Sequence, residues 1–302
     1  MSARTRIVRG GLRVFFKWAS LRREPKIHRI RRRVEFMKRL VPNPPGDTAE
    51  ISLTVAGMPA VRVMTPRSRD DRHILYLHGG GYVAGSTQLY RDFIWRVADA
   101  TETRVLCINY RLAPEHPFPA AVDDSIAAYR WLLSQGADPR RMTIMGDSAG
   151  GGLTFATLLR LRDERAPLPA SAVALSPWTD LALTGETYKS NARSDPMVNV
   201  RQVPALARHY LASADPKHPY ASPLYGDPRG LPPTLIQVGS DEILRDDAER
   251  IAEKLRAVAS AVELQIWPNM PHVWQTMARV LPEARQAIDR IGEFVRQTQA
   301  PK

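Results

Sequence analysis

The sequence has 302 residues, of which 44% are hydrophobic and 25% are charged, and this ordinary globular composition excludes a disordered or fibrous chain. The length is enough for one large domain with an appendage, or for two domains. Residues 1–40 carry the whole formal net charge of +12, with 14 Lys and Arg side chains against two acids, while the rest of the chain is balanced. Such an asymmetry points to contact with an anionic surface, either lipid or nucleic acid.

No stretch reaches the roughly 18 uninterrupted apolar residues of a membrane span. Arg13 and Lys17 interrupt the apolar run near the N-terminus, and no small-residue cleavage site follows, so we expect neither a transmembrane segment nor a signal peptide. The one cysteine, Cys107, cannot form an internal disulfide and is predicted to be a buried small hydrophobe. We therefore expect a cytoplasmic protein that is able to associate with a membrane surface.

Two helices are predicted before the first break in the chain. Val8, Leu12 and Phe15 recur at helical spacing within a basic amphipathic helix over 5–21, and a second helix is predicted over 26–41. The segment PNPPGD at 42–47 then ends the helical pattern. We divide the chain into an N-terminal helical cap segment, 1–45, and a main domain, 46–302.

Short β-rich runs alternate with helical patterns in the main domain. Alternation of this kind predicts an α/β fold with a mostly parallel sheet of about eight strands and helices on both faces. The first two strands, joined by a short turn, are expected to form an antiparallel edge hairpin. The predicted strands are 51–55, 60–64, 73–78, 104–110, 142–146, 172–176, 234–239 and 262–267, and the predicted helices are 88–101, 119–135, 149–163, 245–258 and 283–297.

The connection over residues 177–233 is longer than a crossover between parallel strands needs. It contains a predicted helix near 200–212 and many prolines. We interpret its part at about 180–220 as an insertion that adds to the cap.

The pentapeptide Gly146-Asp147-Ser148-Ala149-Gly150 joins a predicted strand directly to a predicted helix. In this context a G-x-S-x-G motif forms a sharp turn that projects the serine hydroxyl, and the glycines leave room for it. A glycine-rich phosphate loop is the competing interpretation, but no G-x-G-x-x-G or Walker pattern is present. Ser148 is therefore the predicted nucleophile.

A serine hydroxyl needs a base near neutral pH. Of the seven histidines, His272 lies in a loop between the last predicted strand and the last predicted helix, and it follows the serine in the chain order of an α/β-hydrolase triad. The acid is expected after the preceding strand, where Asp241 is the first carboxylate. Glu242 and Asp246 remain competitors, and Asp241 has helix capping as its structural alternative.

Donors for an oxyanion are expected in the glycine run that follows the third predicted strand. Residues 78–81 read His-Gly-Gly-Gly, and glycines let backbone N–H groups approach a substrate oxygen. The N–H of Ala149, directly after the predicted nucleophile, is expected to complete this set of donors, the oxyanion hole. His78 itself is interpreted as a residue that orients the loop.

Five motifs resemble the hormone-sensitive-lipase-like family of microbial carboxylesterases, over roughly residues 45–300. The resemblance implies an α/β-hydrolase fold, a Ser–Asp–His triad, a cap made of N-terminal helices plus an insertion, and hydrolysis of short- to medium-chain acyl esters. It matches the oxyanion amides to Gly80, Gly81 and Ala149. The family's acid usually stands before Pro-Leu, whereas Asp241 here precedes Glu-Ile-Leu. The motifs are HGGGY at 78–82, NYRLAPEHPFPAAVDD at 109–124, GDSAGGGL at 146–153, LSPWTDL at 175–181 and MPHVW at 270–274.

These observations predict a carboxylic ester hydrolase that needs no metal or organic cofactor and acts on a small-molecule ester. An amidase or a lactone hydrolase on the same triad is the alternative, and a non-catalytic ligand-binding homologue is disfavoured because His272 is present. Trp178, Met197, Tyr210 and Trp274 are candidates for lining an acyl site, with the core as the alternative. The oligomeric state stays open, with a dimer as one option.

The basic N-terminus allows three interpretations. It covers the acyl pocket, or it contacts an anionic membrane with Phe15, Phe16 and Trp18 as anchors, or it binds nucleic acid. The last is not expected, because no nucleic-acid-binding motif is present.

Overall fold

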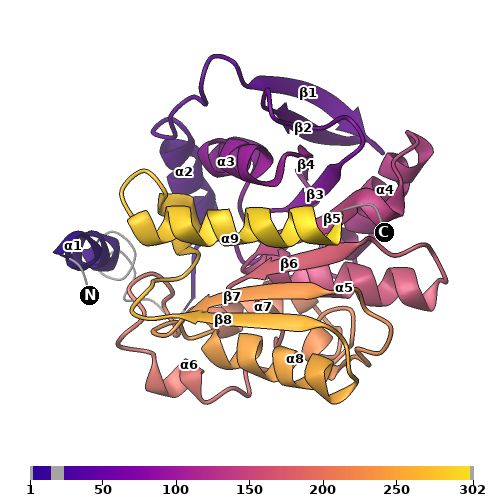
Figure 1. Ribbon diagram of the computed structural model, residues 1–302. Coiled ribbons are helices and arrows are strands. Elements are labelled where there is room, and N and C mark those ends of the chain that lie inside the picture. Colours follow the sequence, from indigo (N-terminus) through magenta and orange to yellow (C-terminus); the bar gives the residue numbers. More distant parts are fainter. Residues whose placement is uncertain (1–2, 15–23, 300–302) are drawn as a thin grey trace.

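The computed structural model describes residues 3–14 and 24–299 (Figure 1). Within them an eight-stranded sheet has the order β1-β2-β4-β3-β5-β6-β7-β8. The β1–β2 hairpin is antiparallel, β2 also runs antiparallel to β4, and every pairing from β4 onward is parallel. The predicted α/β fold with a mostly parallel sheet is thus confirmed. The strands are β1 (Ala49–Val55), β2 (Met58–Met64), β3 (His73–Leu77), β4 (Arg104–Ile108), β5 (Met142–Asp147), β6 (Ser171–Leu175), β7 (Thr234–Gly239) and β8 (Val262–Trp267).

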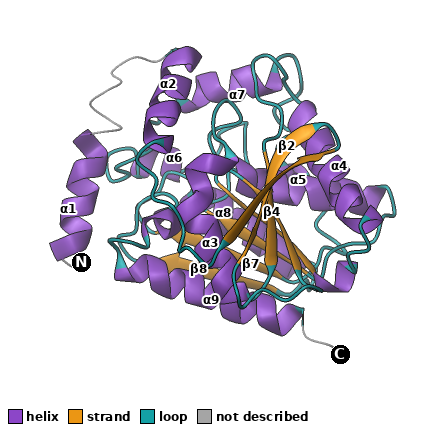
Figure 2. Cartoon of the chain, turned by 90° about the horizontal axis from the view of Figure 1, so that it is seen from above, coloured by secondary structure: helices purple, strands orange, loops and turns teal. Residues whose placement is uncertain are grey.

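Helices cover both faces of the sheet (Figures 1 and 2). The apolar side chains of α3 and α9 pack with one set of strand residues, and those of α4, α5 and α8 pack with the other set. Strands β5, β6 and β7 are buried along their whole length because both of their faces are covered. These helices are α3 (Arg91–Thr101), α4 (Ala120–Ser134), α5 (Ala149–Asp163), α8 (Arg245–Ala257) and α9 (Pro282–Thr298), with a 3-10 turn η2 (Thr87–Tyr90) before α3.

Two N-terminal helices precede the sheet. They are α1 (Ala3–Leu12) and α2 (Ile27–Lys38). The second agrees with the helix predicted over 26–41. The first covers the start of the helix predicted over 5–21, whose remainder, with Phe15, Phe16 and Trp18, extends into residues 15–23 outside the described part.

The N-terminal helix α2 is fastened to the loops that follow β3 and β4. Arg31 donates from Nε to the carbonyl of Val83 at 2.8 Å and from Nη2 to the carbonyl of Ala113 at 2.9 Å. Its guanidinium also pairs with Glu115 at 2.6 Å, and this hydrogen bond lowers the pKa of Glu115 to about 2. Since parallel strands end at one edge of the sheet, α2 lies along the edge where ligands bind in α/β folds.

The long β6–β7 connection, 177–233, contains three short helices, α6 (Thr187–Ser190), α7 (Val203–Leu211) and η4 (Pro223–Tyr225). The backbone N–H of Phe118 donates to the carbonyl of Tyr210 at 2.7 Å, which ties α7 to the loop before α4. The division into a cap segment, an insertion and a main domain remains an interpretation. Within the described ranges, no helix combines the length and the apolar character needed to cross a bilayer.

Candidate active site

Ser148 stands at the turn between β5 and α5, with backbone angles of φ 54° and ψ −120°. A non-glycine residue in this region is strained, which is typical of a nucleophile held on a sharp strand-to-helix turn. The glycines on either side are required by space. A Cβ atom on Gly146 would lie 2.3 Å from the carbonyl oxygen of Gly150, and one on Gly150 would lie 1.9 Å from that of Leu77.

His272 lies in the loop after β8, and the structure places it next to Ser148. The Nε2 atom of His272 lies 2.9 Å from the Oγ atom of Ser148, and its Nδ1 atom lies 2.7 Å from an oxygen of Glu242. The side chain of His272 is only 8% exposed. A hydroxyl, an imidazole and a carboxylate therefore form one continuous hydrogen-bonded chain, which is the geometry that activates a serine.

The prediction that Asp241 would be the partner of His272 is wrong. The Oδ2 atom of Asp241 pairs with Arg9 at 2.6 Å, and its Oδ1 atom accepts from the hydroxyl of Ser240 at 2.8 Å. Glu242, the neighbouring residue named as a competitor, occupies the acid position. Position along the chain favoured the first carboxylate after the strand, but the turn after β7 directs Asp241 away from His272, and the next side chain reaches the imidazole.

Buried donors fix the carboxylate of Glu242. Its Oε1 atom accepts from the hydroxyl of Ser176 at 2.7 Å and from the N–H of Gly239 at 2.6 Å, and the side chain is fully buried. The hydroxyl of Ser176 also accepts from the N–H of Val273 at 3.1 Å. Ser176 thus joins the end of β6 to Glu242 and to Val273, the residue that follows His272. It lies in the LSPWTDL motif, but no pattern in the sequence pointed to a role for it.

Two opposing effects act on the pKa of His272. Burial alone would lower it, but the hydrogen bond and the negative charge of Glu242, helped by Asp195 and Asp147, outweigh burial and raise the pKa above its ordinary value. The imidazole is therefore a stronger proton acceptor than a free histidine. A base that accepts the serine proton and later returns it benefits from such tuning.

The glycine run after β3 approaches the same turn. Gly80 and Gly81 have φ angles of 124° and 63°, which glycine adopts without strain, and a Cβ on Gly80 would lie 2.1 Å from the carbonyl oxygen of Ala84. In the described part of the chain, the N–H groups of Gly80, Gly81 and Ala149 donate to no other group. A Cβ on Gly81 would lie 3.2 Å from Leu206 of α7, so α7 lies over the loop.

Asp147 couples this loop to the serine turn. Its carboxylate is buried, and it accepts from the hydroxyls of Tyr76 at 2.6 Å and Tyr90 at 2.7 Å and from the N–H of Gly79 at 2.8 Å. Burial raises the pKa of Asp147, although all three hydrogen bonds act to lower it. Asp147 thereby fixes Gly79, the first glycine of the run.

His78 is also buried, and it lies inside the loop away from the triad. Its Nδ1 atom lies 2.8 Å from the carbonyl oxygen of Gly79, and its ring stacks on Tyr110 with centroids 4.4 Å apart. Burial lowers the pKa of His78 to about 4, so it is neutral near pH 7. This arrangement agrees with a residue that orients the loop.

The aromatic candidates for the acyl site fall into two groups. Tyr210 stacks on Tyr82 with ring centroids 3.7 Å apart, and the ring of Trp178 lies 6.1 Å from the same Tyr82 ring. The backbone N–H of Trp178 donates to the carbonyl of Ser148 at 2.9 Å, which places this group on the serine side. Trp274 instead packs against Trp267 in the core under α9. Met197 is half-buried in the β6–β7 connection.

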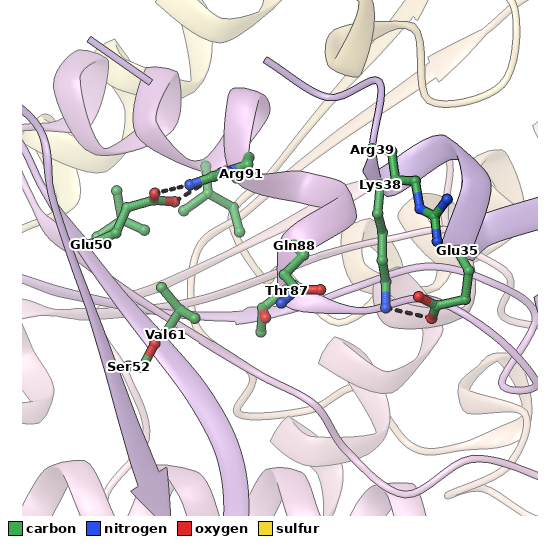
Figure 3. A pocket seen from close by; sticks show the side chains of 11 residues that line it. Glu35, Lys38, Arg39, Glu50, Ser52, Val61, Thr87, Gln88 and Arg91 are labelled. Carbon is green, nitrogen blue, oxygen red and sulfur yellow. Dashed lines mark hydrogen bonds and ion pairs between the residues drawn. The ribbon is translucent and has the colours of Figure 1, made fainter. Parts of the chain in front are cut away.

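A separate cavity of about 380 Å³ lies between α2, the β1–β2 hairpin and the start of α3 (Figure 3). Its charges are largely paired with one another, since Lys38 contacts Glu35 at 2.6 Å and Arg91 contacts Glu50. Ser148 is not among its lining residues. No group of three or more His, Cys, Asp or Glu side chains in the described ranges is placed to hold a metal ion.

Comparison with known proteins agrees with the fold. A family model described as the α/β hydrolase fold matches residues 74–276. An acetyl-hydrolase of Streptomyces hygroscopicus is 46% identical over 253 residues, covering 84% of this chain and 83% of its own. An esterase of Acinetobacter venetianus is 38% identical over 222 residues, covering 73% of each chain.

Solved structures extend the likeness over the whole chain. An esterase from the bacterial hormone-sensitive lipase family superposes with a TM-score of 0.94 at 46% identity, covering 99% of both chains. The esterase EstE5, in a crystal soaked with p-nitrophenyl butyrate, superposes with a TM-score of 0.93 at 42% identity, covering 100% of both chains. The chain therefore belongs to the α/β-hydrolase family and, within it, to the esterases of the hormone-sensitive lipase group.

Proposed function

We propose that this enzyme is a serine carboxylesterase that cleaves short- to medium-chain acyl esters through an acyl-enzyme intermediate. The observation that carries the proposal is the continuous hydrogen-bonded chain from Ser148 through His272 to Glu242. Ser148 is the nucleophile, His272 is the general base and acid, and Glu242 is the residue that orients and charges the base.

In the first step, the Oγ atom of Ser148 attacks the ester carbonyl carbon while its proton passes to Nε2 of His272. Glu242 accepts from Nδ1 and stabilises the imidazolium that forms. The tetrahedral intermediate then collapses, the bond to the alcohol oxygen breaks, and His272 gives its proton to the departing alcohol. The acyl group is left on Ser148.

In the second step, a water molecule loses a proton to His272 and attacks the acyl carbon. Collapse of this second intermediate returns the proton to the oxygen of Ser148 and releases the carboxylic acid. The two steps together consume one water and one ester and produce one acid and one alcohol. No other reactant is required.

The backbone amides of Gly80, Gly81 and Ala149 are the proposed donors to the oxyanion in both steps. Three features support this: these amides have no other acceptor among the described residues, the glycines carry no side chain, and Ala149 begins α5, whose N-terminal dipole favours negative charge. Each donor of this kind typically contributes about 10²-fold to 10³-fold in kcat.

Two observations support the substrate class: the side chains that lie near Ser148, and the names of the proteins that this chain resembles. The stacked pair Tyr82 and Tyr210 and the side chain of Leu206 lie beside the glycine run and offer apolar surface to a small acyl group. One relative is named an acetyl-hydrolase, and another structure was obtained with p-nitrophenyl butyrate. Both names point to small acyl groups.

A series of p-nitrophenyl esters from acetate to palmitate tests this proposal, with matched anilides and a lactone alongside. We expect kcat/KM to be highest at acyl chains of two to about eight carbons and lower on the anilides and the lactone, with Ser148→Ala as the blank. An optimum at palmitate would overturn the chain-length claim. A preference for anilides or for the lactone would instead identify an amidase or a lactone hydrolase on the same triad.

A further inference from the structure

One guanidinium joins three segments of the chain beside the active site. Arg9 of α1 is 9% exposed, although it lies in a basic segment near the N-terminus. Its Nη1 atom contacts Asp241 at 2.6 Å and donates to the carbonyl of Asn269 at 2.8 Å, and its Nη2 atom donates to the carbonyl of Ser194 at 3.1 Å. The contacts lie in the loop after β7, in the loop after β8 and in the β6–β7 connection.

Two of these segments carry the catalytic acid and base. Asp241 directly precedes Glu242 in the acid loop, residues 240–244, and Asn269 comes three residues before His272 in the base loop, residues 268–273. The hydroxyl of Ser240 also accepts from the N–H of Asn269 at 2.8 Å, so Arg9 adds to a direct hydrogen bond between the two loops.

The third segment supports the acid loop from the cap side. Asn191 donates from its amide to the carbonyls of Ser240 and Glu242 at 3.1 and 2.8 Å, and the carboxylate of Asp195 accepts from the N–H of Ile243 at 3.1 Å. Arg9 reaches the same segment through Ser194. The backbone on both sides of Glu242 is therefore held by polar groups from outside the sheet.

We propose that Arg9 is a positioning residue that fixes the acid and base loops relative to each other, so that α1 completes the active site. Arg9 touches neither Ser148 nor the imidazole, and it acts by holding the backbones on which Glu242 and His272 stand. Since a misplacement of about 1 Å can cost an enzyme about 10²-fold in rate, a tie of this kind is worth measuring. This inference rests on the proposed function.

The test replaces Arg9 by Met, which keeps the apolar stem and removes the donors. We expect kcat on p-nitrophenyl butyrate to fall about 10-fold to 10²-fold with KM changed less than about twofold. Arg9→Lys, which keeps the charge opposite Asp241, is expected to recover part of the loss. Dividing each rate by the active sites titrated with a phosphonate ester removes any contribution from unfolded protein.

Arg13→Met is the matched control, because Arg13 belongs to the same N-terminal region, is exposed and makes, with the described residues, only two contacts, both of 3.4 Å. We expect it to keep kcat within about twofold of the wild type, as for an exposed residue whose loss disturbs no buried contact. A normal kcat per titrated site in Arg9→Met would overturn the inference, and so would a loss equal to that of Arg13→Met. Activity remaining in Ser148→Ala would overturn the proposed function instead, so the two failures are distinguishable.

A second inference comes from the outward face of α2. Arg29, Arg32, Phe36 and Leu40 follow one another at three- and four-residue spacing, and all of them are exposed, with Phe36 at 55% and Leu40 at 66%. Arg39 lies beside them and is also exposed. Large apolar side chains surrounded by arginines are typical of a helix that lies in the interface of an anionic bilayer.

The neighbouring helix presents a similar combination. Ile7 and Val14 are 75% and 66% exposed, next to the exposed arginines Arg6 and Arg13. Figures 1 and 2 show α1 and α2 at the same end of the molecule, and the contacts of Arg9 and Arg31 place both helices beside the loops that follow the parallel strands. The two exposed faces thus lie at the active-site edge.

We infer that these faces of α1 and α2 dock on an anionic lipid surface and bring the active-site edge toward the bilayer. The charge of residues 1–40 complements such a surface, whereas the balanced remainder of the chain does not. Charge alone would hold the helices only at the lipid headgroups. The exposed apolar side chains can also enter the acyl-chain region of the bilayer.

Sedimentation with vesicles tests this inference. The variant Arg29→Gln, Arg32→Gln, Arg39→Gln is expected to bind vesicles of phosphatidylglycerol and phosphatidylcholine about 10²-fold more weakly than wild type at low salt. Its activity on soluble p-nitrophenyl butyrate is expected to stay unchanged. The control variant removes the same charge from other exposed sites, Arg140→Gln, Arg229→Gln, Arg290→Gln.

Equal binding by the two triple variants would overturn the inference, and so would equal binding to vesicles of pure phosphatidylcholine. Binding of double-stranded DNA without binding of vesicles would also overturn it, and would assign the basic face to nucleic acid.

Discussion

Replacing Ser148 with alanine is expected to lower kcat for p-nitrophenyl butyrate by about 10⁶-fold, as removal of the nucleophile does in other serine hydrolases. The substitution removes one oxygen at a turn whose φ of 54° is set by the surrounding backbone, so the fold is expected to persist. Steady-state kinetics and a thermal melt of the same preparation check both statements.

Ser134→Ala is the control for this substitution. Ser134 is exposed at the end of α4, and its hydroxyl only donates to the carbonyl of Trp131. We expect its kcat to match that of the wild type. A Ser148→Ala enzyme that kept more than about 1% of wild-type kcat would contradict the assignment of the nucleophile, because the oxyanion donors and the base alone supply far less.

Replacing Glu242 with glutamine is expected to lower kcat by about 10⁴-fold, because the amide cannot stabilise the imidazolium and can favour the wrong tautomer of His272. The side chain keeps its size within a fully buried position. Asp241→Asn is the matched control, since Asp241 pairs with Arg9 and not with the base. We expect that variant to lose no more than about 10-fold.

The pH profile adds an independent check on the same pair. The negative charge of Glu242 raises the pKa of His272 against the effect of burial. The base must be neutral, so kcat/KM of the wild type falls as the pH drops through this raised pKa. In Glu242→Gln this negative charge no longer offsets the effect of burial, so the pKa of His272 is lower than in the wild type. The acid limb of the pH profile is therefore expected to move to lower pH. A larger loss of kcat, or a larger shift of the acid limb, in Asp241→Asn would contradict the choice of Glu242.

Sequence patterns were sufficient for the sheet and for the helices that cover it, because each of these elements has a local signal in the sequence. The run over 234–239 and the helix over 149–163 coincide with β7 and α5, since continuous apolar residues and a glycine-bounded start mark their limits. The turn at Ser148 was likewise visible, because its G-x-S-x-G spacing is local in the chain. Gly146 is required by a contact within the turn, whereas Gly150 is required by the carbonyl of Leu77 in the neighbouring strand β3. The proximity of His272 to Ser148 follows from its place after the last parallel strand.

The choice between Asp241 and Glu242 could not be made in the same way. Both carboxylates follow β7, and the turn there decides which one faces the imidazole. That turn is shaped by partners distant in the chain, among them Ser176, Asp195 and Arg9. None of these contacts leaves a periodic trace in the sequence. The role of Arg9 is hidden for the same reason. Among the described basic residues of 1–40 it alone is buried, whereas the nearby arginines Arg6 and Arg13 are exposed.

The most direct test of the central claim is to trap the covalent enzyme. A p-nitrophenyl alkylphosphonate reacts with an activated serine by forming an oxygen–phosphorus bond and releasing one p-nitrophenolate, and it does not hydrolyse readily afterwards. The account predicts one adduct per chain, located by peptide mass spectrometry on Ser148 and formed far more slowly in Glu242→Gln. An adduct on another residue, or continued ester hydrolysis by enzyme fully labelled at Ser148, would contradict it.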